Sequence, residues 1–286
     1  MGRREHALEI ELPVRAGLPP HRRVLRGNLT LPEQVERPPV VTLVPGYLAS
    51  ANWAFLPRLT AELRGRGLAT LALTLSGSGF AEDAGQVTER IAFEHNTYAQ
   101  ELEDLAAASE WLSKRSEVDG SRQGIFGHSR GSAMALLHAA ETGRFQALCT
   151  WSTVGSVGRY DPDRIELWRR EGRLPVQTAG GQRFELAPDL LEDFTKNAAK
   201  YDLERAADRF AGTVLLVHGS RDRSVPVQEA REVVGRFGDR GSLVEIEATG
   251  HNFGARHPGR EPGPALARAL EVTSQYFARE LLSEPG

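Results

Sequence analysis

The chain has 286 residues, of which 40% are hydrophobic and 26% charged, and its formal net charge is −3. This balance is typical of a soluble globular protein with a sizeable core, and the small charge gives no electrostatic reason to expect nucleic acid or an anionic membrane as a partner. The one cysteine, Cys149, excludes an intrachain disulfide and a cysteine-rich zinc site.

The first residues, MGRREHALEI, are charged from the third position onward. They contain no apolar run of signal-peptide length, and no uncharged apolar run in the chain approaches the length that crosses a bilayer. Position 6 is His6, where a myristoylation signal has serine or threonine. We therefore expect a cytoplasmic protein with no membrane anchor.

Two segments with alternating polarity, residues 8–14 and 22–32, open the chain and predict antiparallel strands at the edge of a sheet. Continuous apolar runs follow, of the kind that forms strands buried on both faces. These runs are residues 39–46, 68–75, 123–128, 147–153, 212–219 and 242–250.

Patterns with helical spacing lie between these runs, and Thr97 stands where an N-cap would begin the second of them. The predicted helices are residues 54–66, 98–115, 129–142, 227–237 and 264–282. This alternation predicts an α/β fold with right-handed crossovers and a mostly parallel, eight-stranded sheet flanked by helices.

The alternation is interrupted between residues 154 and 200. No buried strand is predicted there, and Leu190, Leu191 and Phe194 lie roughly on one helical face. We interpret 154–200 as a small helical cap over the carboxyl edge of the sheet, inserted into a core domain formed by residues 1–153 and 201–286.

The sequence GHSRG, residues 127–131, stands directly between a predicted strand and a predicted helix and fits the pattern G-x-S-x-G. In such a sharp turn, a Cβ two residues before or after the serine would collide with the neighbouring strand or helix. Ser129 is therefore predicted to be a nucleophile, with an ordinary helix N-cap as the alternative.

A serine needs a base to take its proton, and the base needs an acid to fix its tautomer. In an open parallel sheet the active residues follow the carboxyl ends of the strands. Asp222 follows one buried run and His251 follows the next. The chain thus has a serine, an acid and a histidine at strand ends, in that order.

With GHSRG, HGSRDRSVP and GHNFG in this order, the chain resembles the α/β-hydrolase superfamily over nearly its whole length. Within the superfamily it looks most like small esterases of the dienelactone-hydrolase and cinnamoyl or feruloyl-esterase kind. The resemblance implies that Ser129 is the nucleophile, Asp222 the orienting acid and His251 the general base.

The resemblance also implies an oxyanion hole formed by the backbone N–H groups of Arg130 and Tyr47, with Leu48 as the alternative to Tyr47. Many relatives have His-Gly in this loop, whereas this chain has Pro45 and Gly46. Because the hole uses backbone donors, Pro45 is expected to change how the loop is braced and not to abolish the hole.

Other residues compete for these roles. His257 is an alternative base, but it precedes a proline in a glycine-rich loop and no strand end positions it. Asp83 and Asp161 are alternative acids that lie outside the position used by the superfamily's order. The histidines interpreted mainly as bracing or structural are His95, His128, His138 and His218.

We expect a serine hydrolase that cleaves small to medium carboxylic esters through an acyl-enzyme, with a small-molecule ester as its partner and the question of a homodimer left open. No metal or cofactor is expected, because H-E-x-x-H, P-loop and dinucleotide-binding patterns do not occur. A thioesterase, acyltransferase or peptidase would use the same residues, and a non-catalytic ligand-binding member of the fold is the alternative from another class. The aromatic residues that could line an acyl pocket, or simply the core, are Trp53, Phe55, Trp168 and Phe194.

Overall fold

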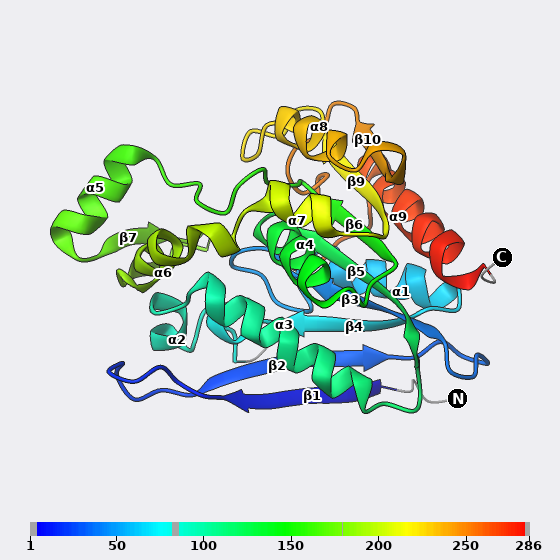
Figure 1. Ribbon diagram of the computed structural model, residues 1–286, viewed down its shortest axis with the longest axis horizontal. Helices are drawn as coiled ribbons and strands as arrows, with labels where there is room; N and C mark the ends of the chain where they lie inside the picture. The colour runs from blue at the N-terminus through cyan, green and yellow to red at the C-terminus, as the bar shows by residue number, and fades with distance from the viewer. Residues whose placement is uncertain (1–4, 82–85, 179, 284–286) are drawn as a thin grey trace.

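The computed structural model describes residues 5–81, 86–178 and 180–283. An eight-stranded sheet lies at the centre of the molecule (Figure 1). The strand order is β1-β2-β4-β3-β5-β6-β9-β10. β1 pairs with β2, and β2 with β4, in antiparallel fashion, and every other neighbouring pair is parallel. The strands are β1 (Glu5–Leu12), β2 (Arg23–Thr30), β3 (Pro39–Val44), β4 (Ala69–Thr74), β5 (Asp119–His128), β6 (Ala147–Trp151), β9 (Thr213–Gly219) and β10 (Gly241–Ile246).

The sheet confirms the predicted architecture, and burial explains why the sequence patterns were informative. All six residues of β3 and all six of β4 are buried, as expected for central strands covered on both faces. The edge strand β1 instead has mostly exposed or half-buried residues. The continuous apolar runs therefore became the inner strands, and the alternating segments became β1 and β2 at one edge.

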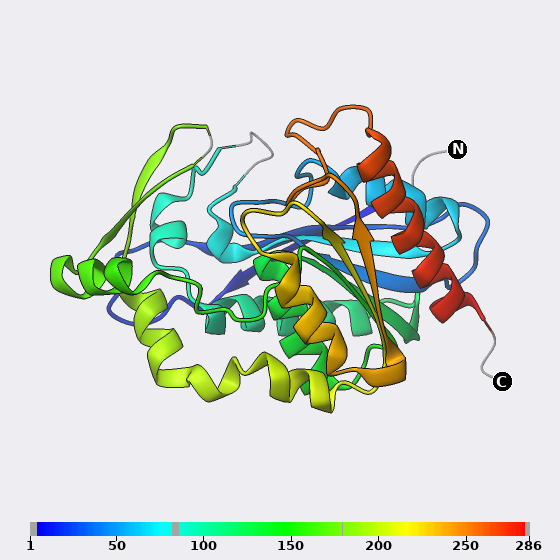
Figure 2. The same ribbon diagram turned by 90° about the horizontal axis from the view of Figure 1, so that it is seen from above.

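Helices cover both faces of the sheet (Figure 2). α1 (Leu56–Gly65) and α9 (Pro264–Leu282) pack together on one face. α3 (Tyr98–Ser113), α4 (Arg130–Thr142) and α8 (Val227–Gly235) lie on the other. Two short helices, α2 (Arg90–Glu94) and α7 (Leu203–Arg209), were not predicted, since five and seven residues give too little periodic signal. The 3₁₀ turns are η1 (Ser76–Ser78), η2 (Ala198–Lys200) and η3 (Gly238–Arg240).

The predicted N-cap at Thr97 is present. Its hydroxyl accepts a hydrogen bond from the backbone N–H of Gln100, whose side chain in turn accepts from the N–H of Thr97. This reciprocal capping box satisfies two N–H groups that an uncapped helix would leave without partners. It fixes the start of α3, which borders the site described below.

The described part of residues 154–200 contains two α-helices, α5 (Pro162–Glu171) and α6 (Asp189–Asn197), and also a hairpin of β7 (Leu174–Gln177) and β8 (Arg183–Leu186). The hairpin was not anticipated, because its four-residue strands are only partly buried. Figure 1 shows α5, β7 and α6 on the side toward which β4 points. The segment therefore stands at the carboxyl ends of the parallel strands, where ligand sites form in such sheets.

The segment is attached to the core through the region before α3. The side-chain amide of Gln182 accepts from the backbone N–H of Val87 and donates to the carbonyl of the same residue. The carboxylate of Asp189 is ion-paired with Arg15 and lies 3.0 Å from Nδ1 of His95.

No helix in the described ranges is long and apolar enough to span a membrane.

Candidate active site

Ser129 occupies the sharp turn between β5 and α4 with φ 53° and ψ −122°. Such a conformation is strained for a residue with a Cβ, and strain of this kind is concentrated at functional sites. The serine side chain makes no capping hydrogen bond to α4, so it does not act as an ordinary N-cap. Its backbone N–H donates to the carbonyl of Trp151 on β6 at 2.9 Å, which fixes the turn against the sheet.

The glycines on either side of Ser129 are required by close backbone contacts. A Cβ added to Gly127 would lie 2.3 Å from the carbonyl oxygen of Gly131. A Cβ added to Gly131 would lie 2.3 Å from the carbonyl oxygen of Pro45. The GHSRG pattern therefore reflects the packing of the turn against both α4 and the loop after β3.

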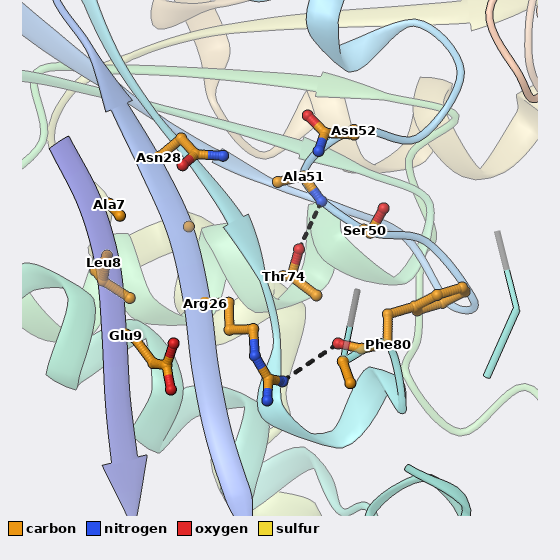
Figure 3. Close-up of a pocket in the computed structure, with 12 residues that line it drawn as sticks. Ala7, Leu8, Glu9, Arg26, Asn28, Ser50, Ala51, Asn52, Thr74 and Phe80 are labelled. Atoms are coloured by element: carbon orange, nitrogen blue, oxygen red, sulfur yellow. Dashed lines mark hydrogen bonds between the residues drawn. The ribbon is translucent and has the colours of Figure 1, made fainter. Parts of the chain in front are cut away.

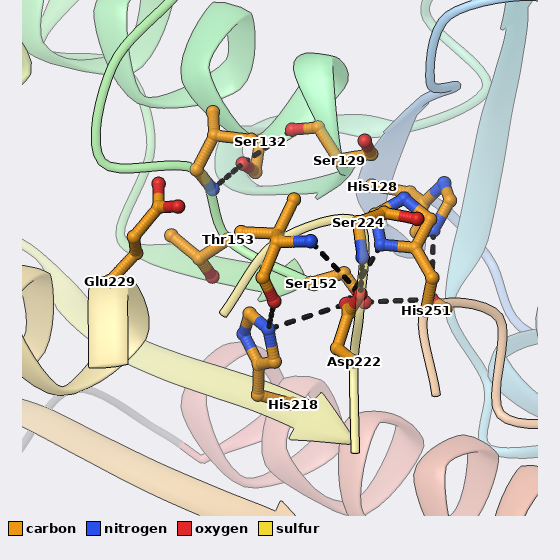
Figure 4. Close-up of polar contacts among 12 residues, drawn as sticks. His128, Ser129, Ser132, Ser152, Thr153, His218, Asp222, Ser224, Glu229 and His251 are labelled. Carbon is orange, nitrogen blue, oxygen red and sulfur yellow. Dashed lines mark hydrogen bonds and ion pairs between the residues drawn. The ribbon is translucent and has the colours of Figure 1, made fainter. Parts of the chain in front are cut away.

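Asp222 and His251 come together after β9 and β10 (Figure 4). The Asp222 Oδ2 atom lies 2.8 Å from Nδ1 of His251, and Oδ1 accepts from the backbone N–H groups of Ser224 and Val225 at 2.8 and 3.0 Å. Burial by itself raises the pKa of Asp222, but hydrogen bonds from His218, His251 and Val225 outweigh it and place the pKa well below the usual value. The carboxylate is thus ionised, and Nδ1 of His251 must carry the proton between them.

Ser129 and His251 both line one cavity of about 220 Å³. In the described part of the chain no hydrogen bond joins their side chains. Such contacts are often loose in enzymes without substrate and tighten when substrate binds. The other residues that line the cavity are Tyr47, Tyr98, Arg130, Val154, Ser156, Val157, Arg159, Tyr160, Ser224 and Val225.

The two residues expected to form an oxyanion hole lie beside Ser129. Arg130 is the first residue of α4, so its backbone N–H has no acceptor within the helix. Tyr47 follows Gly46, at which an added Cβ would be 3.4 Å from Cβ of Ser129 and 2.9 Å from Nδ1 of His128. The loop after β3 therefore packs directly against the turn of Ser129.

A second set of contacts holds the backbone of His251. Its carbonyl oxygen accepts from the Ser152 hydroxyl at 2.7 Å and from Nε2 of His128 at 3.3 Å. Burial, followed by the neighbouring His251, lowers the pKa of His128 to about 3. His128 is therefore neutral and carries its proton on Nε2, because a carbonyl can only accept.

His218 and Ser132 are further supports. Nε2 of the fully buried His218 lies 2.9 Å from the carbonyl oxygen of Val225 and 3.4 Å from Oδ2 of Asp222. The Ser132 hydroxyl donates to the carbonyl of Ser129 at 2.6 Å. His218 was predicted at a strand end, but neither Ser132 nor Ser152 was predicted to support the site, since a lone serine carries no motif that would reveal these contacts.

The competing residues lie in other environments. Nδ1 of His257 accepts from the backbone N–H of Ala54 at 3.2 Å, so this histidine joins two loops. Asp161 is exposed and caps α5 through the N–H of Asp163. Asp83 lies outside the described residues.

The remaining histidines make local polar contacts. His95 pairs with Asp189, as described above, and Nε2 of His138 lies 2.8 Å from the hydroxyl of Ser109. Neither residue is among those that line the cavity with Ser129. These contacts fit the structural interpretation of both histidines.

The four aromatic residues weighed for an acyl pocket pack elsewhere. Trp53 stacks on the ring of His128, and Phe55 packs against Trp151 in the core. Trp168 donates from its indole to a carbonyl of β8, and Phe194 contacts Tyr98 edge-on. None of the four is among the described residues that line the cavity, whose aromatic wall consists of Tyr47, Tyr98 and Tyr160.

Another groove, of about 240 Å³, lies over β1, β2 and β4 (Figure 3). Its described lining residues include Arg26, Asn28 and Asn52 but none of the predicted catalytic residues. Within the described ranges, no group of three or more histidine, cysteine or carboxylate side chains is arranged to hold a metal ion.

One known protein family matches this chain over most of its length. The sequence profile of the prolyl oligopeptidase family matches residues 61–281, more than half of the chain, and no curated protein sequence matches.

Solved structures similar to the chain include three hydrolases with 18–20% sequence identity. Est1E from Butyrivibrio proteoclasticus is 18% identical with a TM-score of 0.63, covering 96% of this chain and 97% of its own. A dienelactone hydrolase from Anabaena variabilis is 20% identical with a TM-score of 0.62, covering 98% and 99%. A puromycin-hydrolysing peptidase from Mycobacterium tuberculosis is 20% identical with a TM-score of 0.68, covering 99% of this chain and 40% of its own. These likenesses confirm the predicted α/β-hydrolase fold.

Proposed function

Since the chain belongs to the prolyl oligopeptidase family and has the fold of serine hydrolases, we propose that it hydrolyses uncharged carboxylic esters of small to medium size through an acyl-enzyme on Ser129. The observation that carries the proposal is the strained turn of Ser129 opening on the same cavity as His251, whose Nδ1 is held by Asp222. These are the three roles that nucleophilic acyl transfer requires.

In the proposed mechanism the Ser129 oxygen attacks the ester carbonyl while Nε2 of His251 takes the hydroxyl proton. The backbone N–H groups of Tyr47 and Arg130 stabilise the negative charge that develops on the carbonyl oxygen. Collapse of the tetrahedral intermediate breaks the ester C–O bond, and His251 delivers the proton to the leaving alcohol. Water, activated by the same histidine, then hydrolyses the acyl-enzyme.

The cavity favours neutral acyl groups. Among the described lining residues there are two arginines, and each is paired with an acid, Arg130 with Glu101 and Arg159 with Glu229. A volume of about 220 Å³ fits a short chain or a single ring better than an extended polymer. We therefore expect the site to select acyl groups by their size and shape and not by their charge.

A peptidase is the second candidate, because the family profile and one similar structure carry that activity in their descriptions. An enzyme that binds a substrate's α-ammonium group needs a carboxylate near the scissile bond. Among the described residues that line the cavity there is no aspartate or glutamate. This composition supports esters over substrates with a free amino terminus.

The test compares p-nitrophenyl esters of increasing acyl length with aminoacyl p-nitroanilides, using wild type, Ser129→Ala and the exposed control Ser113→Ala. We expect an optimum among short esters that disappears in Ser129→Ala and persists in Ser113→Ala, and a single fluorophosphonate adduct on Ser129. Faster hydrolysis of the anilides than of the esters would show that the protein is a peptidase and not an esterase. Absence of both turnover and labelling in wild type would reject a serine hydrolase.

A further inference from the structure

The side chain of Arg130 lies over two tyrosine rings at the wall of the candidate active site. Its guanidinium carbon is 4.2 Å from the ring centroid of Tyr47 and 5.3 Å from that of Tyr98. Both distances are within the range in which a cation is attracted to the face of an aromatic ring, and the side chain is only 14% exposed. Arg130 therefore contacts the loop after β3 through its side chain.

Arg130 is held in this position from α3. Its Nη1 donates to Oε1 of Glu101 at 3.2 Å, and Glu101 is 4% exposed. The same carboxylate oxygen accepts from Nδ2 of Asn96 at 2.7 Å. The Tyr98 ring is fixed too, because its hydroxyl donates to the carbonyl of Val157 at 2.7 Å. The guanidinium thus contacts the Glu101 carboxylate and the Tyr98 ring, and buried hydrogen bonds fix both of these groups.

Tyr47 has less support of its own. It is 37% exposed, and the next residue, Leu48, has φ 58°, a conformation that costs energy for a side chain of this size. Its ring contacts are with Arg130 and with Phe93 of α2, 5.7 Å away. The direction of the Tyr47 backbone N–H depends on this loop keeping its shape.

We propose that the Arg130 side chain, held by Glu101, is a positioning group that fixes the Tyr47 loop, so that one residue donates to the oxyanion through its backbone and orients the second donor through its side chain. This inference rests on the proposed function, because it concerns the same oxyanion hole. In this role the guanidinium holds a loop of the protein in place and does not bind an anionic group of the substrate.

Charge balance separates these two uses of Arg130. A guanidinium that binds a substrate carboxylate is most effective when no protein acid neutralises it. Here Glu101 is within hydrogen-bond distance and buried, and the guanidinium carbon lies over two aromatic rings. Loss of Arg130 should therefore affect neutral esters as strongly as anionic ones.

The test is a double-mutant cycle on Arg130 and Tyr47, using Arg130→Met and Tyr47→Leu. The matched control is Arg115→Met, because the Arg115 guanidinium lies over the ring of Trp111 and Arg115 is not among the described residues that line the cavity. The readouts are kcat and KM for a short neutral p-nitrophenyl ester, and the inhibition constant of an alkyl trifluoromethyl ketone, which forms a tetrahedral adduct with the serine. Removing an oxyanion donor costs roughly 10²–10³-fold in kcat. Misplacing one donor should cost less, about 10- to 30-fold.

We expect Arg130→Met and Tyr47→Leu each to lower kcat and the affinity for the ketone by the same factor, with KM changed less than about threefold. The double variant should be no worse than either single variant, and Arg115→Met should resemble wild type. Additive losses, or a loss confined to KM, would overturn the inference. A loss seen only with esters that carry a carboxylate would make Arg130 a substrate contact instead.

Arg130→Met leaves Glu101 buried without its partner, so it can reduce folding stability as well as activity. The variant Arg130→Met/Glu101→Gln removes this uncompensated charge and should show the same loss of ketone affinity. If that variant folds and binds the ketone as tightly as wild type, the positioning role is excluded. If wild type neither hydrolyses esters nor reacts with a fluorophosphonate, the proposed function itself is rejected. Failure of the proposed function can thus be distinguished from failure of the positioning role.

Discussion

Nδ1 of His251 lies 2.8 Å from Oδ2 of Asp222, although 29 residues separate them in the sequence. The aspartate is fixed by two backbone N–H groups, and the carbonyl of the histidine is held by Ser152 and His128. Both partners are therefore oriented before substrate arrives, which keeps the cost of reorganisation low in the reaction.

Replacing Asp222 with asparagine should test this pair most directly. An amide at this position cannot stabilise an imidazolium and permits the wrong tautomer of His251. We expect kcat for the best ester to fall about 10³–10⁴-fold, with KM nearly unchanged. Asp161→Asn, at the exposed cap of α5, is the matched control and should retain wild-type kcat.

Ser152→Ala should show how far the backbone of His251 matters. The substitution leaves the His251 carbonyl with only the longer 3.3 Å contact to His128. We expect kcat to decrease about tenfold, and the free energy of unfolding to decrease by about 1 kcal/mol, the typical net value of one hydrogen bond. Steady-state kinetics and urea unfolding measure the two effects, with Ser116→Ala as an exposed control. Unchanged kcat would show that His128 alone is sufficient.

Gly131→Ala should disrupt the turn of Ser129. The added Cβ would lie 2.3 Å from the carbonyl oxygen of Pro45, and this contact cannot be relieved without moving the backbone. We expect a loss of about 3 kcal/mol in the free energy of unfolding, the upper end of the usual cost of overpacking. Gly120→Ala, where nothing lies within 4 Å of the added Cβ, should remain within about 0.5 kcal/mol of wild type. Similar stability of both variants in urea would contradict the packing argument.

His138→Gln should change how stability depends on pH. Burial, with a contribution from Arg144, lowers the pKa of His138 to about 4, compared with about 6.5 in an unfolded chain. Between pH 6.5 and 4 the unfolded chain therefore binds a proton that the folded chain does not, so stability falls as the pH decreases. Glutamine should reduce this slope by up to about 1.4 kcal/mol per pH unit. Urea unfolding at several pH values measures it, and an unchanged slope would show that His138 does not titrate in this way.

Asp189→Asn should loosen the segment of residues 154–200. Its carboxylate pairs with Arg15, in the loop after β1, and with His95, the residue that follows α2. Weaker attachment should increase local opening more than global unfolding. We expect limited proteolysis within 154–200 to become several-fold faster while the midpoint of thermal unfolding changes little. Asp163→Asn, on the exposed side of α5, should be cut at the wild-type rate.

The sequence by itself determined the eight strands of the sheet, the helices α1, α3, α4, α8 and α9, and the turn of Ser129, because these depend on local patterns. Buried central strands require continuous apolar runs, helices require a 3.6-residue period, and the turn requires Gly127 and Gly131. The order of Ser129, Asp222 and His251 could be interpreted because parallel strands bring their carboxyl ends to one edge. Their catalytic roles remain predictions.

Only the tertiary structure decided what surrounds these residues. The contact of Ser152 with the His251 carbonyl and the position of Arg130 over Tyr47 and Tyr98 join segments 32 to 99 residues apart. No local pattern encodes such contacts, since they arise from how helices and loops pack on the finished sheet. The aromatic residues that line the cavity are therefore Tyr47, Tyr98 and Tyr160. The aromatic residues considered from the sequence were Trp53, Phe55, Trp168 and Phe194.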